Sequence, residues 1–307
     1  MTSPRRAPLD SVSPIVLIAL SRSTTADLVA SSRAELTSLG RQLDHRAHAV
    51  IIGSDLVGSI SAPNHTPAAT GIDPTIAAIT LAQYIYRAGL IVAAAPQRDH
   101  PYNLARRLAS LDHATRGRIG LAIATTDPAA PDGSPWTTAS PDIAAADAVV
   151  AIRDLWRSFP VDAIVADHQT GVFSHSERIV AIDHRGAFDI TGPLQVPTSP
   201  QLLPPVLAWR ASASAATTDT TVLTEVADLI VDESDERFRV YTPRSVSELR
   251  DLLAEIPGLD EHPDHGDTLR ERLGLPDAAP LAAGAGRPVF TAPSDADSHE
   301  GVSAHAR

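Results

Sequence analysis

Several polar residues have types and spacing that could support acid–base catalysis. The dipeptides Asp112-His113 and Asp183-His184 each place a carboxylate beside an imidazole, the pairing that general acid–base chemistry uses. Adjacent residues on a helix do not face each other, so Asp112 and His113 are interpreted as surface or capping residues. His184 falls in a predicted hairpin, where a turn-stabilising role is favoured over a catalytic one.

Two His pairs and one Ser complete the candidate groups. His45 and His48, like His262 and His265, have the spacing of two metal ligands, but no third or fourth ligand converges from an ordered neighbouring segment. Ser110 has no His and Asp partners placed to activate it, so a serine hydrolase mechanism is excluded. The sequence therefore predicts no metal site and no activated serine.

The composition excludes several other chemistries. All 25 basic residues of the 307-residue chain are Arg, and it contains no Cys. Without Lys there is no Schiff-base catalysis, and without Cys there is no thiol nucleophile, disulfide or thiolate–zinc site. A formal net charge of −12 and an aromatic content of 4% argue against a nucleic-acid partner.

The apolar runs do not predict a membrane span. Residues 14–20 form a short run, and residues 77–95 are interrupted by polar side chains, whereas a spanning helix needs about 20 apolar residues. The start of the chain has basic residues before the first run, as a secretion signal does. However, Asp10 interrupts that pattern, and Arg22 follows where small residues should mark cleavage. We therefore expect a buried first strand and a cytoplasmic protein.

The elements that must position these residues form a regular alternation. Continuously apolar runs predict strands, as expected for strands buried on both faces, and segments of helical periodicity lie between them. This rhythm favours an α/β fold with parallel strands and crossover helices, and both a barrel and an open doubly wound sheet fit it. The expected strands cover residues 14–20, 49–52, 90–94, 119–124 and 206–209, and the expected helices cover residues 27–43, 73–88, 101–111 and 141–156.

The two ends of the chain and one internal stretch depart from this rhythm. Residues 1–13 and 276–307 lack the periodicity of a folded core and are predicted to be disordered, which leaves one domain over residues 14–275. Within that domain, apolar runs at 178–183 and 188–191 in polar, Pro-rich surroundings predict a β-hairpin excursion.

One family resemblance accounts for many of these segments. Residues 100–113, HPYNLARRLASLDH, followed by Gly117-Arg118, resemble the signature helix of the luciferase-like flavin monooxygenases, and within them the nitrilotriacetate monooxygenase branch. The resemblance covers residues from about 73 to 275. Further matching blocks are Leu155-Trp156, Asp167, Gly171-Val172-Phe173, Ile182-Asp183-His184-Arg185-Gly186, Phe188, Gly192-Pro193-Leu194, Pro200-Gln201, Pro205-Val206-Leu207, Ala227-Asp228 and the segment 268–275.

The resemblance implies a fold and a type of reaction. It implies a (β/α) TIM-type barrel, usually homodimeric, that holds reduced FMN at the carboxyl ends of its strands. It also implies a separate flavin reductase as partner and the use of reduced FMN and O2 to oxidise a small organic substrate. In this chain residues 232–239 leave too little length for the strand–helix units that the family places there, so we expect an incomplete barrel with fewer than eight strands.

The resemblance also implies where the flavin ring would lie. The acid expected after the second strand falls on Ser54 or Asp55. Ala94 ends the third strand, and Thr125 after the fourth strand would offer a hydroxyl group to the ring. The family's usual Asn in the fourth strand is replaced here by Ala122.

Two further departures concern the flavin's charge and its phosphate. Asp142 occupies the position of a flavin-facing Tyr, and a carboxylate is unfavourable beside an anionic reduced flavin. The phosphate loop lacks the family's glycines, so its backbone approaches a phosphate less closely. Arg210 would supply charge, and Ser212 or Ser214 a hydroxyl group. These departures predict weak FMN binding.

Two functional classes remain open at this point. The first is an FMN-dependent monooxygenase supplied by a partner reductase. The second is a non-catalytic relative that kept the scaffold and binds a flavin or a partner. Use of a deazaflavin in place of FMN is a third alternative.

Overall fold

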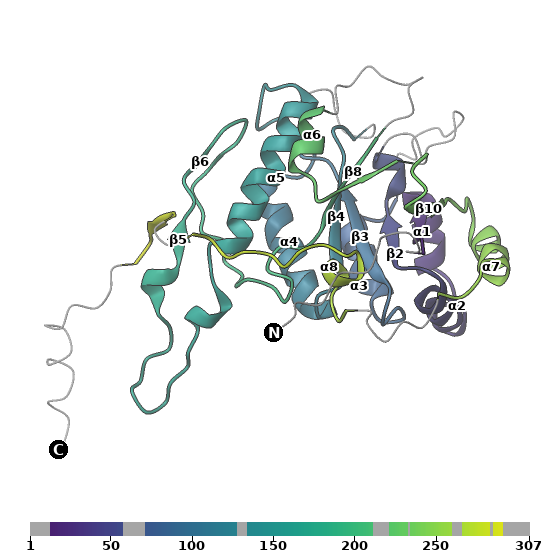
Figure 1. Cartoon of the computed structure of the whole chain (residues 1–307), viewed down its shortest axis with the longest axis horizontal. Helices are drawn as coiled ribbons and strands as arrows, with labels where there is room; N and C mark the ends of the chain where they lie inside the picture. The colour runs from purple at the N-terminus through teal and green to yellow at the C-terminus, as the bar shows by residue number, and fades with distance from the viewer. Residues whose placement is uncertain are drawn as a thin grey trace, which may run out of the picture.

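The computed structural model has a curved parallel sheet at its centre, with helices packed around the outside (Figure 1). It describes residues 13–57, 71–127, 134–210, 221–232, 234–259, 266–282 and 285–290. The sheet contains seven strands in the order β10-β1-β2-β3-β4-β8-β9, and every neighbouring pair is parallel. The strands are β1 (Ile15–Leu20), β2 (Ala49–Ile52), β3 (Gly89–Ala94), β4 (Ile119–Ile123), β8 (Val206–Trp209), β9 (Leu229–Val231) and β10 (Phe238–Tyr241).

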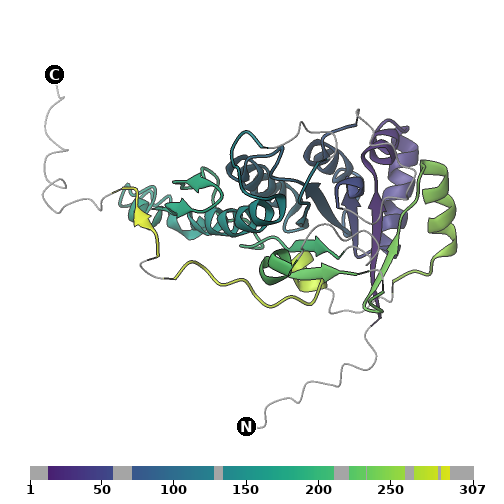
Figure 2. The ribbon, with the colours of Figure 1, turned by 90° about the horizontal axis from the view of Figure 1, so that it is seen from above.

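The helices follow the strands in the alternation that the sequence predicts. Figure 2 shows the helices of the first half of the chain along one side of the strands, and the later, green strands toward the other side. In the described ranges, no helix is both long enough and apolar enough to cross a membrane. The helices are α1 (Arg22–Val29), α2 (Arg33–Arg46), α3 (Pro74–Leu81), α4 (Pro101–Thr115), α5 (Pro141–Arg157), α6 (Thr221–Val226), α7 (Val246–Glu255) and α8 (Leu269–Arg272), with short 3-10 turns η1 (Ser54–Leu56), η2 (Val161–Ala163) and η3 (Ser176–Arg178).

The sheet is a nearly closed TIM-type (β/α) barrel. β9 and β10 are the two ends of the strand order, and only residues 232–237 connect them. A crossover between parallel strands needs about a dozen residues or more, so this link cannot contain another strand–helix unit. The predicted incomplete barrel with fewer than eight core strands is confirmed over the residues that the structure describes.

Alternate side chains of the strands face two separate cores. On β1, Leu17 and Ala19 belong to the core inside the barrel, whereas Ile18 and Leu20 pack in the core beneath the helices. All four are buried. Burial on both faces explains why the strand sequences are apolar throughout rather than alternating.

Side-chain size inside the barrel differs between its two ends. At the carboxyl ends of the strands the interior positions include Ala19, Ala93 and Ala122, whereas Leu17 and Ile91 fill it farther toward the amino ends. Small side chains leave space at the carboxyl end, which we call the mouth.

The opposite end of the barrel is plugged by α8. Leu269 is fully buried, and its backbone N–H donates to the Gly117 carbonyl at 2.7 Å. A Cβ atom added at Gly89 would lie 2.4 Å from the Leu269 side chain, and one added at Gly120 would lie 3.2 Å from it. Glycine at these two positions therefore makes room for the plug.

Two helices differ from their predicted bounds. The helix predicted over residues 27–43 is two helices, because Ser32 caps a new one: its Oγ accepts from the Glu35 N–H at 3.2 Å. The helix predicted over residues 73–88 ends at Leu81. After it, the Asp44 carboxylate accepts the N–H groups of three successive residues, 86 to 88, which are therefore satisfied without a helix.

The predicted hairpin excursion is present, but its strands are shifted. The paired strands are β6 (His184–Arg185) and β7 (Asp189–Ile190), so residues 184–185 form a strand instead of the turn. β5 (Val180–Ala181) pairs instead with β11 (Arg287–Pro288), which lies in the segment where the sequence predicts no ordered structure. Charge strengthens this second pairing, because Arg287 donates two hydrogen bonds of 3.0 Å to the Asp183 carboxylate.

Candidate active site

A cavity of about 150 Å³ lies at the mouth of the barrel. Its lining combines small apolar residues of β3 with charged residues that follow β1, β3 and β4, and parallel β/α barrels place their active sites at this end. The described residues that line it are Arg22, Leu56, Gly71, Ile72, Asp73, Pro74, Ala93, Ala94, Ala95, Arg98, Asp99 and Asp127.

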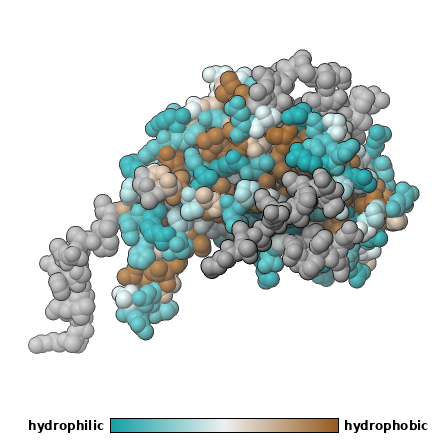
Figure 3. All heavy atoms as spheres, viewed as in Figure 1, coloured by the Kyte–Doolittle hydropathy of each residue, from teal (hydrophilic) through white to brown (hydrophobic). Residues whose placement is uncertain are grey.

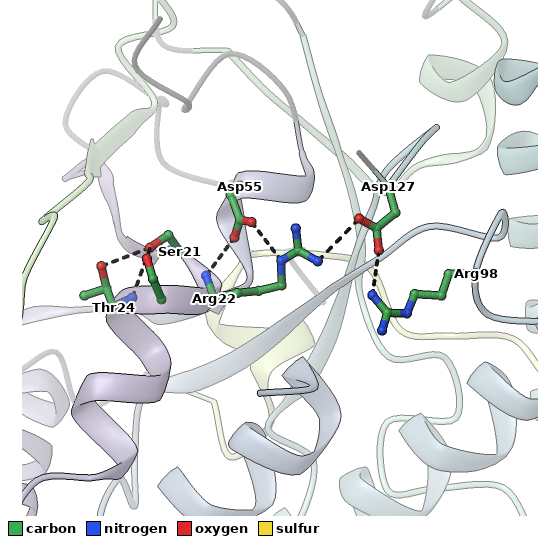
Figure 4. A network of polar contacts seen from close by, with 7 residues as sticks. Ser21, Arg22, Thr24, Asp55, Arg98 and Asp127 are labelled. Carbon is green, nitrogen blue, oxygen red and sulfur yellow. Dashed lines mark hydrogen bonds and ion pairs between the residues drawn. The ribbon is translucent and has the colours of Figure 1, made fainter. Parts of the chain in front are cut away.

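A chain of ion pairs, which we call the mouth network, connects the ends of four strands (Figure 4). Arg22 donates its backbone N–H and its Nε–H to the two carboxylate oxygens of Asp55, at 2.7 and 2.8 Å. Its Nη1 donates to one oxygen of Asp127 at 3.3 Å, and Arg98 donates to the other at 3.1 Å. The mouth network thus consists of Asp55, Arg22, Asp127 and Arg98.

Burial makes the inner part of the mouth network electrostatically important. The side chains of Arg22 and Asp127 are only 7% and 2% exposed, whereas that of Arg98 is 58% exposed. A buried charge is costly unless it is paired and hydrogen-bonded. The two carboxylates and two guanidinium groups balance each other, so the network adds little net charge to the mouth.

Local sequence explains how Arg22 and Asp55 meet. Ser21 follows β1 and caps α1, because its Oγ accepts from the Thr24 N–H at 3.1 Å, so the chain turns into a helix at Arg22. After β2, Gly53 has a φ of 83° and leads into η1, which carries Asp55. A Cβ at Gly53 would also lie 2.9 Å from the Pro74 ring, so glycine is required there for two reasons.

Three buried donor nitrogens at this end of the barrel have no hydrogen-bond partner in the part of the chain that the structure describes. They are Nη2 of Arg22, Nε of Arg107 on α4, and Nε1 of Trp209, the last residue of β8. A buried donor without an acceptor costs about 1–3 kcal/mol. Such groups point to a ligand that supplies acceptor atoms, and Arg22 lines the cavity.

A second group of charges lies on the rim of the cavity. Arg107 of α4 forms ion pairs with Asp99 and with Asp73, the residue that caps α3. Burial raises the pKa of the Asp73 carboxyl, but hydrogen bonds from Thr75 and the nearby Arg107 outweigh burial and leave the pKa below its ordinary value. Asp73 therefore stays ionised and contributes negative charge to the rim.

The structure brings four of the predicted flavin-facing residues to the mouth. Asp55 is part of the mouth network, and Ser54 beside it is buried. Ala94 lines the cavity directly. Thr125 is half-buried after β4, two residues before Asp127.

The other predicted residues are not gathered around the cavity in the same way. Arg210 is exposed after β8 and forms an ion pair with Asp232 at 3.5 Å. Asp142 lies in the first turn of α5 and does not line the cavity. Ser212 and Ser214 lie outside the described residues, so the predicted phosphate contacts remain predictions.

The interpretation of Asp112 as a surface or capping residue is wrong. Asp112 is fully buried and accepts hydrogen bonds from the Ile119 N–H at 3.1 Å and from the Gln201 side chain at 2.7 Å. It joins the end of α4, the start of β4 and the excursion near residue 201. Burial raises the pKa of its carboxyl group, although the hydrogen bonds oppose this. Its partner in sequence, His113, is exposed and lies 3.1 Å from the Pro197 carbonyl.

The remaining His residues have structural contacts. His184 Nε2 lies 3.1 Å from both oxygens of Asp147 on α5, which fixes the hairpin to that helix. His48 Nδ1 accepts from the Val16 N–H at 3.0 Å, whereas His45 is exposed. Across the described ranges, no three His, Asp or Glu side chains converge as a metal site requires, and residues 262 and 265 fall outside these ranges.

Sequence reasoning missed three of the four residues of the mouth network. Arg22, Arg98 and Asp127 each follow a strand within four residues of its last position. Because barrel sites form at the carboxyl ends of strands, a search for charged residues just after each apolar run would have found all three.

Comparison with known proteins identifies the family. No family model matches the chain. It is 33% identical over 229 residues to one of the subunits of pristinamycin IIA synthase from Streptomyces pristinaespiralis, covering 66% of this chain and 77% of that protein. It is also 30% identical over 214 residues to N-acetyl-S-(2-succino)cysteine monooxygenase of Bacillus subtilis, covering 66% of this chain and 48% of the relative. Nitrilotriacetate monooxygenase component A of Aminobacter aminovorans is 32% identical over 142 residues, which cover 42% of this chain and 30% of that protein.

Solved structures support the fold. DmoA from Hyphomicrobium sulfonivorans has a TM-score of 0.54 at 22% identity, covering 78% of this chain and 56% of that one. A long-chain alkane monooxygenase has a TM-score of 0.53 at 20% identity, covering 66% of this chain and 53% of that one.

The chain belongs to the luciferase-like monooxygenase family, in the branch that includes nitrilotriacetate monooxygenase. It spans about half the length, or less, of most of the relatives it matches.

The residues at the mouth fit a flavin in two respects. The unpartnered N–H groups of Arg22 and Trp209 match the two carbonyl oxygens of an isoalloxazine, which are acceptors. Ala93, Ala94 and Ala95, at and just after the end of β3, give the cavity an apolar wall with little side-chain bulk. The charges of the mouth network compensate each other, however, and the weak binding that the sequence predicts stays a prediction.

Proposed function

We propose that this chain is a component of an FMN-dependent monooxygenase that uses reduced FMN from a separate flavin reductase, and O2, to oxidise a small organic substrate in the cytoplasm. The observation that carries the proposal is the buried Arg22 guanidinium group, whose Nη2 has no hydrogen-bond partner among the described residues, beside a cavity at the barrel mouth. When bound, reduced FMN would supply the electrons that activate O2.

The chain's own residues would bind and orient the flavin. Arg22 would donate its Nη2–H to an acceptor on the ring, while Asp55 and Asp127 hold the guanidinium group in a fixed position. Because this donor is fixed before the ligand arrives, little side-chain entropy is lost on binding. The apolar wall of Ala93, Ala94 and Ala95 would exclude water from the ring.

Affinity for FMN should be low. Two carboxylates already compensate the charge of Arg22, so its attraction for an anionic ring is weaker than that of a free guanidinium group. We therefore expect the protein to purify largely colourless and to bind reduced FMN only from solution. Tight stoichiometric FMN in the purified protein would contradict this expectation.

The test is an anaerobic titration with reduced FMN, followed by absorbance. Arg22→Gln should raise the dissociation constant about tenfold or more, because a charge-assisted hydrogen bond contributes about 1.5–3 kcal/mol. Arg98→Gln is the matched variant, because Arg98 shares Asp127 but is exposed, and it should raise the constant less than about threefold. Equal effects of the two substitutions would show that Arg22 has no special role. Reduced deazaflavin in the same titration tests the alternative cofactor, and its tighter binding would replace FMN in the proposal.

A non-catalytic, partner-binding role is the second candidate. It is favoured by Asp55, which is tied to Arg22 rather than free to face a ring. It is also favoured by the relative from Streptomyces pristinaespiralis, which is itself one subunit of a synthase. Absence of binding at millimolar reduced FMN, together with activity only after a larger subunit is added, would select this candidate.

We also infer that the chain forms a homodimer. An incomplete barrel has strand edges at β9 and β10, and its helices present exposed apolar side chains such as Ile76 and Ile143. Association commonly buries surfaces of this kind. Light scattering at micromolar concentration should give the mass of two chains, and a monomer there would contradict the inference.

A further inference from the structure

A two-stranded arm projects from the body of the molecule. The arm comprises residues 161–175 and extends below the barrel at the lower left of Figure 1. A bridge between Ile164 and Ser174 closes its base, and the Asp167 N–H donates to the Val172 carbonyl at 2.8 Å near its tip. The arm is therefore an ordered ribbon rather than an irregular loop.

The surface of the arm is unusually apolar. Phe173 is 69% exposed, and Val165 and Val172 are each 40% exposed. Figure 3 shows apolar colour on the arm, away from the main body. Exposed apolar side chains gathered on a projecting element are typical of a surface that contacts another molecule. Asp167 adds a negative charge at the tip, because hydrogen bonds from Thr170 and the Gln169 N–H lower the pKa of its carboxyl group.

A groove on the same chain has complementary properties. It has a volume of about 500 Å³ and lies between α3, α4 and residues 195–196, with Ile76, Ile79 and Leu111 among its lining residues. Arg106 also lines it and is exposed, and within the described part of the chain no ion pair is formed with it. The groove thus offers an apolar surface with a positive charge at its side.

The arm and the groove are joined at their bases. The Val161 N–H donates to Thr198 Oγ1 at 2.8 Å, and the Thr198 N–H donates to the Phe159 carbonyl at 2.8 Å. Thr198 follows the groove wall at Val196 by two residues. The arm therefore starts beside the groove and leads away from the body of the chain rather than back onto it (Figure 1).

We propose that the arm of one copy of this chain lies in the groove of a second copy, and that the exchange is reciprocal about a two-fold axis. Phe173 and Val172 would pack on Ile76 and Ile79, and Asp167 would pair with Arg106. Matching apolar surfaces and opposite charges on a single chain favour a second copy over an unrelated partner. The proposal rests on the homodimer inferred above and adds the surfaces that form it.

Because the chain has no Cys, engineered cysteines test the contact directly. Chains carrying Phe173→Cys are mixed with chains carrying Ile79→Cys under mild oxidation. A disulfide-linked dimer of the mixed type should form at least about fivefold faster than the dimers of either variant alone. The matched control replaces Ile79→Cys with Tyr86→Cys, which is also exposed and beyond the end of α3 but does not line the groove, and it should show no such excess.

A second variant tests the energy of the contact. Phe173→Asp should raise the dimer dissociation constant about tenfold or more in sedimentation or light scattering. Its thermal midpoint at high dilution and its affinity for reduced FMN should stay at the values of the unmodified chain, because Phe173 is exposed and does not line the cavity at the mouth.

Each other outcome overturns a distinct claim. A monomer at all concentrations contradicts both the homodimer and the arm contact. A dimer without the mixed disulfide, or one that Phe173→Asp leaves intact, keeps the homodimer but contradicts the arm contact. Binding of the arm to a larger subunit in place of a second copy also contradicts it. Loss of FMN binding alone concerns only the function proposed for the mouth.

Discussion

The two ends of the barrel use the same residue types for opposite purposes. At the plugged end, Arg270 donates with all its side-chain nitrogens: Nε to the Pro276 carbonyl at 2.7 Å, Nη1 to the Leu203 carbonyl at 3.0 Å, and Nη2 to Asp228 at 3.5 Å. At the mouth, Arg22 is buried to a similar degree, but its Nη2 has no partner among the described residues. The interior is filled by Leu269 at one end and left as a cavity at the other.

This difference indicates that the plugged end stabilises the fold and that the mouth binds a ligand. A buried arginine whose three side-chain nitrogens all have acceptors fixes the chain, whereas one with an unpartnered nitrogen beside a cavity is prepared for a ligand. Substitutions at the plugged end should therefore reduce folding stability strongly, and substitutions at the mouth should reduce it less but alter binding more.

The largest loss of stability is expected for Asp112→Ala at the plugged end. The substitution removes the acceptor for the buried N–H groups of Ile119 and Gln201. We expect the free energy of unfolding to fall by about 4 kcal/mol, since each buried donor that loses its acceptor costs about 1–3 kcal/mol. Urea denaturation measures it, with the exposed Ser110→Ala on the same helix as control. A decrease in the free energy of unfolding below about 1 kcal/mol would show that Asp112 contributes little to stability.

Leu269→Ala should follow, with a loss of about 3 kcal/mol, because removing a fully buried leucine leaves a cavity. The substitution tests whether the plug closes the barrel. The same denaturation experiment applies, with the half-exposed Ile143→Ala as control. If both variants lost equally little, Leu269 would not be needed to close this end of the barrel.

At the mouth, Asp127→Asn should cost less, about 2 kcal/mol, because Arg22 keeps its ion pair with Asp55. Arg98→Gln removes only the exposed partner of Asp127 and should change the free energy of unfolding by no more than about 0.5 kcal/mol. A loss at Asp127 as large as that at Asp112 would erase the contrast between the two ends.

The smallest expected effect is on pH dependence. Burial raises the pKa of Asp112 above its ordinary value of 3.8, so the folded state holds this proton more tightly than the unfolded state. The contribution of Asp112 to stability is therefore greatest at low pH and declines as pH rises from 3.8 through the raised pKa. Since Asp112→Asn does not titrate at this position, the wild-type chain should gain stability relative to this variant as the pH is lowered from 7 toward 3.8. A difference that moved the other way would show that hydrogen bonds to Asp112 outweigh its burial.

The sequence predicts β1, β2, β3, β4 and β8 well because these strands are buried on both faces over most of their length, whereas β9 and β10 are partly exposed and are not among the expected strands. Runs such as residues 49–52 and 119–124 have no polar position that could be confused with a loop. The break between α1 and α2 was missed although its signal was present, since Ser32 and Glu35 have the spacing of a helix cap. The end of α3 had no local signal, because it depends on Asp44, which lies far away in the sequence.

The candidate site is predicted only in part for a similar reason. Asp55 was found because the family resemblance marks the end of the second strand. Arg22 and Asp127 are 105 positions apart, and only the closing of the barrel brings them together. Asp112 was assigned to the surface because it was interpreted together with His113. In the structure the two residues have different partners: Asp112 is bonded to Gln201, and His113 lies near the Pro197 carbonyl.

The sheet has a seam, because β9 and β10 are its two edge strands and do not pair with each other. A closed barrel offers no preferred place to come apart, whereas each strand beside a seam is held by one neighbour only. Local unfolding should therefore start at the two edge strands, spread inward and reach β3 last. Amide hydrogens should exchange in that order, with those of β9 and β10 fastest and those of β3, at the middle of the strand order, slowest.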